Sequence, residues 1–215
     1  MTGETPRRAY NSERRREAAD RNRAAVLGAC RELLFRDGYH ATTIRAVAER
    51  AGVSPETVYK TFGGKPGMVK ALWDTTLAGD DEPVPMGARP QARAMLRAGE
   101  PGVKLKLYAA YVRGIHERIT PLFTLLTQAG PEVGEVLEAG ERERLVGVTS
   151  FITHLEEAGL LAPDADPVRL ADALWALAGP QLYTQLTSGR GWSADTYEEW
   201  LATTLTAILI PPSQR

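Results

Sequence analysis

The sequence predicts an all-α protein with a small N-terminal helical domain followed by a larger helical one. Apolar residues recur at the three- and four-residue spacing of helices along most of the 215 residues, and no segment alternates convincingly as a strand would. The composition changes at Gly79–Pro90, a stretch rich in glycine, proline and acid. We therefore expect a disordered basic tail over residues 1–12, a first domain over 13–78 and a second over 79–215.

The overall composition bounds the class of protein. The chain is 43% hydrophobic and 25% charged, which is ordinary for a globular protein, and no apolar run approaches the roughly 18 residues of a membrane helix. The single cysteine, Cys30, excludes an intrachain disulfide and a cysteine-based zinc site. Three scattered histidines have no metal-binding spacing. We expect a soluble, cytoplasmic protein without metal, cofactor or membrane partner.

Charge is distributed unevenly along the chain. Through Trp73 there are 14 basic and 8 acidic residues, a balance of +6, whereas the remainder has a balance of −7. A basic front and an acidic back indicate that only the front meets a polyanion. Chance asymmetry among solvated helix faces is the alternative. Charge alone does not decide between them.

The first and fourth helices enclose the N-terminal domain. The first is expected over Ser12–Arg36, because Val26, Leu27, Cys30, Leu33 and Leu34 share one face. Asp37-Gly38 ends it, with Gly38 suited to a left-handed cap. The fourth is expected from Lys65 to Leu77.

Two short helices lie between them. Thr42 or Thr43 caps the first of the pair, and Gly52 ends it. Ser54 caps the second, and Pro55 stands in its first turn, where the missing N–H costs nothing. Two short helices joined by a glycine-containing turn form a helix-turn-helix, whose second helix is the one that can enter a major groove. The sequence thus predicts an N-terminal three-helix DNA-binding domain with Ser54–Thr61 as recognition helix.

The second domain is expected to contain only helices. One spans Pro101–Thr120 and is interrupted by Pro121, which begins a short helix through Leu126. Others are expected over Pro131–Ala158, after Asp166 with a kink at Pro180, and after a Ser193 cap.

From Arg23 to Trp73 the order of residues closely resembles the DNA-binding domain of the TetR (tetracycline-repressor) family of bacterial transcription regulators. The resemblance covers about a quarter of the chain and rests on matching motifs. These are Ala29, Phe35-x-x-Gly38-Tyr39, Thr42-Thr43-Ile44, Val47-Ala48, Ala51-Gly52-Val53-Ser54, Thr57-Val58-Tyr59, Phe62 and Lys65. The remainder is similar to the family's ligand-binding and dimerisation domain in architecture and length.

The resemblance implies a set of DNA contacts. Phosphate would be held from the starts of the second and fourth helices, and bases and phosphates would be met from the recognition helix. The residues are Thr43, Ser54, Pro55, Glu56, Thr57, Tyr59, Lys60 and Lys65. Pro55 and Glu56 would bear on operator choice. Three of the eight have a plainer alternative: Glu56 as a first-turn acid that complements the helix dipole, Tyr59 as a core-edge aromatic, and Lys65 as a solvated lysine.

The resemblance also implies a ligand pocket and a dimer interface. Candidate pocket residues are Tyr108, Tyr111, His116, Phe123, Phe151, His154, Trp175 and Tyr183, with plain core packing as the alternative. The interface would be a four-helix bundle built from Pro167–Leu186 and Ser193–Leu209 of each subunit. Its candidate contacts are Leu174, Trp175, Leu182, Trp200, Leu201, Leu205 and Ile208, with burial inside one subunit as the alternative.

The expected protein is a homodimeric repressor, released from a double-stranded DNA operator by a small-molecule inducer. A helical DNA-binding or architectural protein without a ligand is the rival. An enzyme is not expected: FGGK at Phe62–Lys65 lacks the spacing of a P-loop, and no nucleophile elbow or HExxH motif occurs. Arg7, Arg8 and Arg14–Arg16 form either an arm that reaches DNA or a solvated tail.

Overall fold

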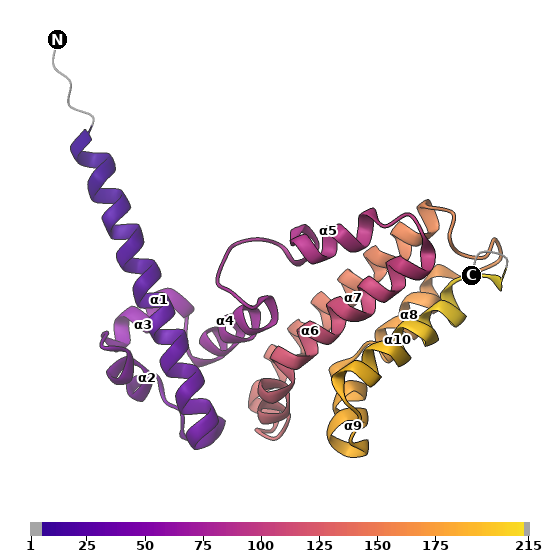
Figure 1. Cartoon of the computed structure of the whole chain (residues 1–215). Helices are drawn as coiled ribbons and strands as arrows, with labels where there is room; N and C mark the ends of the chain where they lie inside the picture. Colours follow the sequence, from indigo (N-terminus) through magenta and orange to yellow (C-terminus); the bar gives the residue numbers. More distant parts are fainter. Residues whose placement is uncertain (1–5, 213–215) are drawn as a thin grey trace, which may run out of the picture. The chain divides into compact units, whose positions relative to one another are not determined.

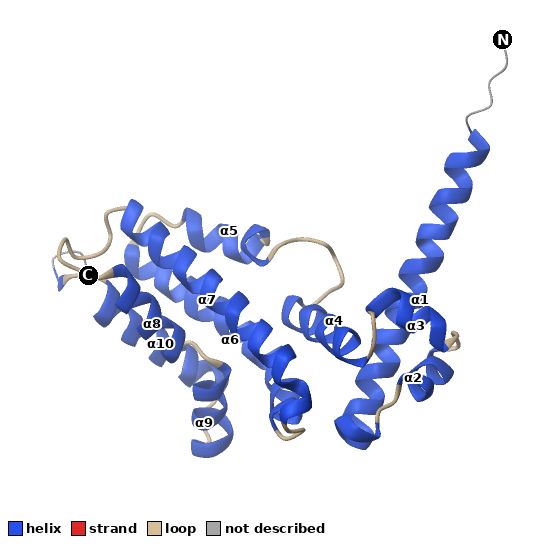
Figure 2. Ribbon diagram, turned by 180° about the vertical axis from the view of Figure 1, so that it is seen from behind, coloured by secondary structure: helices blue, strands red, loops and turns tan. Residues whose placement is uncertain are grey.

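The computed structural model describes the backbone of residues 6–212 and the side chains of residues 14–212. In this part of the chain every regular element is a helix (Figures 1 and 2). The order is α1 (Pro6–Ala41), α2 (Ile44–Ala51), α3 (Pro55–Phe62), α4 (Lys65–Ala78), η1 (Met86–Ala88), α5 (Pro90–Arg97), α6 (Pro101–Thr127), η2 (Pro131–Val133), α7 (Gly134–Glu157), α8 (Pro167–Leu177), α9 (Pro180–Arg190) and α10 (Ala194–Leu209). The all-α prediction is confirmed.

The chain forms two compact units. The first extends to Thr75 and also includes Leu125–Val136, while the second comprises Thr76–Thr124 and Leu137–Arg215. The predicted boundary after residue 78 differs from this division at two segments: it assigned Thr76–Ala78 to the first domain and Leu125–Val136 to the second. Leu126, Val133 and Val136 are buried, so this later segment contributes apolar side chains that the sequence pattern had assigned to the second domain.

The first unit is built on the second half of α1. Val26, Cys30 and Leu34 of α1 are buried, as are Val47 of α2 and Val58 of α3. α1 begins at Pro6, whereas a disordered tail is predicted over residues 1–12; residues 1–5 lie outside the described part. Good helix formers, mostly arginine, glutamate and alanine, follow from Glu13 onward, and Pro6 occupies a first-turn position that proline tolerates, so the helix extends back through residues 6–12.

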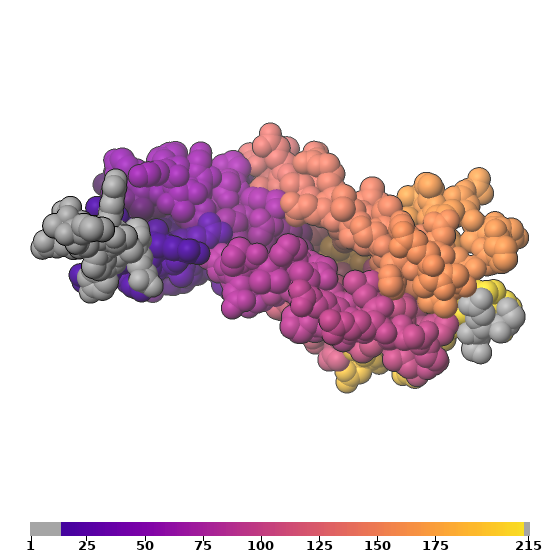
Figure 3. Space-filling view, turned by 90° about the horizontal axis from the view of Figure 1, so that it is seen from above, coloured from indigo at the N-terminus to yellow at the C-terminus, as the bar shows by residue number. Residues whose placement is uncertain are grey.

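The second unit packs α5 to α10 around one core. Tyr108 stacks on Phe151 with ring centroids 4.4 Å apart, and Leu155, Leu174 and Leu205 are buried in the same cluster. In the space-filling view α5–α6 (magenta) and α7 (orange) lie side by side (Figure 3). The core of this unit is therefore shared by helices that are distant in sequence.

Two prolines behave differently from the prediction. Pro121 lies inside a continuous α6, because its exposed ring removes one backbone hydrogen bond while the buried Ile119 and Leu122 hold the helix on the other side. Pro180 does not kink one helix but separates two. Gly179 before it is extended (ψ 150), as residues that precede proline prefer, and caps α9.

Candidate nucleic-acid interface

Capping residues fix the start of α2 and both ends of the turn between α2 and α3. Thr43 Oγ1 accepts from the Ala46 backbone N–H at 3.1 Å at the start of α2. Gly52 ends α2 with φ 68 and ψ 31, a left-handed conformation that favours glycine, and donates its N–H to the carbonyls of Ala48 and Glu49. Ser54 Oγ then accepts from the Thr57 N–H at 3.3 Å and caps α3. The turn is therefore three residues long, and the predicted helix-turn-helix is present.

One face of α3 is open to solvent. Pro55, Glu56 and Lys60 are exposed, and Tyr59 keeps 57% of its surface accessible. The same helix turns Val58 inward, where it is fully buried. The alternative of Tyr59 as a core-edge aromatic does not fit an exposure this large. A core-edge ring would be mostly covered by its neighbours, so packing within the fold does not explain why an aromatic residue stands here.

Glu56 is engaged by the start of its own helix. Hydrogen bonds from its own backbone N–H and from Ser54 hold the pKa of this carboxyl below its usual value. This contact favours the interpretation of Glu56 as an acid that complements the helix dipole. The carboxylate keeps acceptor positions beside these two bonds, and a contact from Glu56 to a cytosine amine stays a prediction.

Lys65 is held by the end of α1 and is not an ordinary solvated lysine. Its Nζ donates to the Tyr39 carbonyl at 2.5 Å and lies 3.9 Å from the centroid of the Tyr39 ring. Partial burial lowers the pKa of Lys65. An ammonium has three donors, so one N–H still has the capacity to meet a phosphate. Lys65 therefore ties the start of α4 to α1 in addition to any role towards DNA.

Sequence reasoning missed Gly67. A Cβ built on Gly67 would lie 1.9 Å from the Phe62 carbonyl oxygen, far inside contact distance. The start of α4 therefore presses directly on the end of α3, and only glycine permits this approach. Three glycines within Gly63–Gly67 were the available signal in the sequence, but their spacing did not indicate which of them packs against the backbone of α3.

Arg45 was also missed. It is an exposed cation in the first turn of α2, two residues after the Thr43 cap. A cation at a helix N-terminus opposes the helix dipole, so folding does not account for it. Arg50 in the last turn of the same helix pairs instead with Glu32 at 2.8 Å. A polyanion beside the N-terminus of α2 would account for Arg45.

The pocket candidates lie in the second unit and are mostly packed together. Tyr108 and Phe151 stack in the core, and His154 Nε2 lies 3.0 Å from Lys104 Nζ. The remaining members have individual surroundings: Tyr111 donates to the Met86 carbonyl, Phe123 is half-buried, Trp175 lies under Arg144, and Tyr183 contacts the His116 ring.

Several buried polar atoms of this unit have no hydrogen-bond partner within residues 14–212. These are Arg89 Nε, Arg113 Nε, His116 Nδ1, Thr120 Oγ1, Trp175 Nε1 and Tyr197 Oη. His116, Tyr183 and Tyr197 form one aromatic group, with centroids 4.8 to 5.9 Å apart. Burial lowers the pKa of His116 to about 3, so its ring is neutral at neutral pH. Tyr197 was missed by sequence reasoning because its helical spacing is that of a plain core residue.

The interface candidates divide by burial. Leu174, Leu201 and Leu205 are buried in this chain's own core, which corrects the prediction that they meet a partner. Their position on the inward side of α8 and α10 leaves no surface for a second chain. The other members stay accessible in part: Trp175, Leu182 and Trp200 are half-buried, and Ile208 is 42% exposed.

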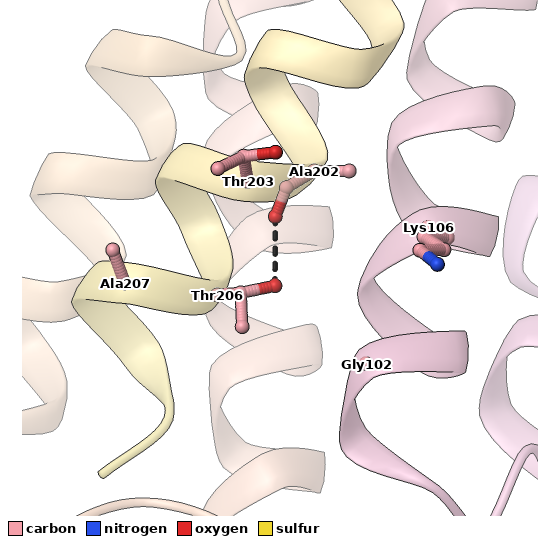
Figure 4. Close-up of a pocket in the computed structure, with 6 residues that line it drawn as sticks. All are labelled: Gly102, Lys106, Ala202, Thr203, Thr206 and Ala207. Carbon is pink, nitrogen blue, oxygen red and sulfur yellow. Dashed lines mark hydrogen bonds between the residues drawn. The ribbon is translucent and has the colours of Figure 1, made fainter. Parts of the chain in front are cut away.

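A shallow hollow of about 360 Å³ lies between α6 and α10. Figure 4 shows Gly102 and Lys106 on α6 across from α10, where Thr206 donates to the Ala202 carbonyl at 2.8 Å. Thr203 and Ala207 complete its lining. None of its residues was among the predicted pocket residues.

Within the described ranges, no group of three or more histidine, cysteine, aspartate or glutamate side chains is placed to hold a metal ion. No helix among residues 6–212 is long and apolar enough to cross a membrane.

The fold and the capped, exposed α3 define a helix-turn-helix protein. Residues 26–72 match the model of the bacterial regulatory proteins of the tetR family. The uncharacterized HTH-type transcriptional regulator YvkB of Bacillus subtilis (strain 168) is 45% identical over 47 residues, which is 22% of this chain and 25% of that protein. The chain thus spans about a quarter of the length of this curated relative.

Two solved structures share the fold over most of both chains. NalD, the secondary repressor of the MexAB-OprM multidrug efflux pump in Pseudomonas aeruginosa, has a TM-score of 0.63 at 24% identity, covering 91% of this chain and 99% of its own. FadR from Bacillus subtilis in complex with stearoyl-CoA has a TM-score of 0.65 at 14% identity, covering 85% and 96%. Residues 26–72 thus match a tetR-family DNA-binding segment, and the chain shares the fold of these two structures over most of its length.

Proposed function

We propose that this protein is a cytoplasmic homodimeric repressor that binds a near-palindromic DNA operator and is released from it by a small molecule. The observation that carries the DNA-binding part is the exposed face of α3, which is held rigidly by the Gly52 turn and the Ser54 cap. Exposed Tyr59 and Lys60 suit phosphate oxygens, while the small side chains near the start of α3 let the backbone approach base edges.

A stripe on α10 supports dimerisation. Trp200, Thr204 and Ile208 follow one another at four-residue spacing and remain half-buried or exposed. Thr203 and Ala207 beside them line the hollow of Figure 4, so the outward side of this helix offers small side chains next to large apolar ones. Such a surface fits a facing helix of a second copy. Two copies would present two α3 helices to half-sites about 34 Å apart or a multiple of that distance.

The unpartnered polar atoms of the second unit support a ligand sensor over a ligand-independent DNA-binding protein. Leaving one buried donor or acceptor unpaired costs about 1–3 kcal/mol. His116 Nδ1, Thr120 Oγ1 and Tyr197 Oη are three such atoms in one domain. A bound molecule or an ordered water could form hydrogen bonds with them. FadR carries stearoyl-CoA in its structure, which supports a small-molecule site in this fold.

Regulation requires only a modest difference between states. If the ligand binds the DNA-incompetent state about 1.4 kcal/mol more tightly than the competent one, saturation lowers operator affinity by up to about tenfold. The rival, a protein whose DNA affinity is constant, predicts no such change.

The test is selection of bound duplexes from a random DNA pool by the purified full-length protein at moderate salt. Enrichment of a two-fold symmetric site would support a dimeric sequence reader and supply an operator. That operator then serves in a screen for compounds that release the protein. Binding that is absent or indifferent to sequence would refute the specific-repressor proposal.

A further inference from the structure

In the N-terminal half of α1, none of the described side chains, from residue 14 to residue 25, is buried. α1 has 36 residues, yet Val26 is the first buried side chain among those described from residue 14 onward. The twenty residues of Pro6–Ala25, called the α1 arm below, would rise about 30 Å as a helix. A helix that buries no apolar face has no packing reason to extend so far.

The composition of the α1 arm excludes an apolar partner and favours a polyanion. It holds seven arginines and three acids, a balance of +4, and apart from Pro6 and Tyr10 no apolar side chain larger than alanine. No stripe of leucine, isoleucine or valine is present on which another protein helix would dock. Arg15 and Arg16 are exposed. Charge complementarity therefore points to a phosphate backbone.

The C-terminal end of the α1 arm lies beside the recognition helix. The Arg23 guanidinium lies 5.3 Å from the centroid of Phe62, the last residue of α3. α1 continues N-terminally beyond the level of α3 (Figure 1). Arg16 stands seven residues before Arg23, hence two turns further along the same face of the helix. A duplex bound by α3 would thus extend past the side of α1 on which Arg16 lies.

We propose that the α1 arm is a second DNA-binding element, which contacts phosphates outside the reach of α3 without reading sequence. This inference rests on the proposed DNA binding by α3. Backbone contacts of this kind add affinity and fix orientation but carry no base specificity. Each phosphate neutralised adds about 0.9 to the slope of log K against log salt.

The test uses the double variant Arg15→Ala/Arg16→Ala of the full chain. Its matched control is Arg142→Ala/Arg169→Ala, which removes the same charge from exposed arginines of the second unit that pair with Glu138 and Asp166. Binding to the selected operator and to a scrambled duplex is measured between about 50 and 200 mM salt. We expect the arm variant to weaken both duplexes by the same factor and to reduce the salt slope by up to about 1.8 per subunit, with the control unchanged.

A slope equal to that of the control overturns the arm proposal, whereas failure of the unmodified protein to bind any selected duplex overturns the proposed function itself. A second variant, Ala19→Pro, keeps every charge but breaks the helix before the first buried residue. Weaker operator binding with unchanged thermal stability supports a rigid helical arm. Full binding by this variant would overturn the helical form of the proposal.

Discussion

The contact between Gly67 and Phe62 predicts opposite effects for two glycine-to-alanine substitutions. In Gly67→Ala the new Cβ would lie 1.9 Å from the Phe62 oxygen and 3.1 Å from its carbonyl carbon. Both are backbone atoms, so the overlap is relieved only if α4 moves away from α3 by more than 1 Å, on the order of the difference from ordinary contact. Overpacking typically costs about 1–3 kcal/mol, and we expect the upper end because no side chain can give way.

Gly28→Ala is the matched control. Gly28 lies in α1, and no atom stands within 4 Å of the place that its Cβ would take, so alanine should raise the free energy of unfolding by about 1 kcal/mol. Urea unfolding gives the stabilities, and hydrogen exchange of peptides from residues 26–72 localises them to the first unit. We expect Gly67→Ala to lose both exchange protection there and operator binding. Equal stability of the two variants would refute the argument that α4 presses on α3.

Three further predictions concern the interface and the second unit. Arg45→Ala should weaken DNA binding and lower its salt dependence while leaving stability unchanged or slightly higher, because Arg45 opposes the α2 dipole; Arg50→Ala should instead lose only its pair with Glu32. Ile208→Glu should give a monomer in sedimentation, whereas Val146→Glu, at a residue 67% exposed on α7, should not. His116 has a pKa lowered by burial from 6.5 to about 3 and is neutral when folded, so the unfolded chain binds the extra proton. Stability should therefore fall as pH drops from about 6.5 to 3, and His116→Phe should flatten that dependence in urea titrations.

The helix-turn-helix was predictable because its signals are local. Thr43, Gly52, Ser54 and Pro55 each act on the backbone within a few residues of themselves, so their types report the turn directly. The outward face of α3 was predictable from the helical spacing of its two inward apolar residues, Val58 and Phe62. In contrast, the contact of Lys65 with Tyr39 joins residues 26 apart, and no pattern in the sequence reports it.

The helices of the second domain were predictable, but which side of each helix faces the core was not. Leu174 and Leu205 have the same spacing whether they face their own core or a partner, so periodicity could not assign them. Pro121 shows the same limit. The helix continues through Pro121 because its ring is exposed, and the sequence does not report which side of α6 packs against the core. The pocket candidates were chosen by residue type, whereas the unpartnered state of Tyr197 is a property of its neighbours.

α4 is held at both of its ends by contacts inside the unit to which each end belongs. Lys65 at its start is bonded to Tyr39, and Gly67 leaves no slack against Phe62, so within the first unit α4 and α3 move together. At the other end, within the second unit, Arg118 of α6 donates to the Leu77 carbonyl at 2.9 Å. A ligand near His116 and Thr120 would lie on the same helix as Arg118, within one turn of it. Within the second unit, a displacement of this turn of α6 would therefore act on the hydrogen bond between Arg118 and Leu77.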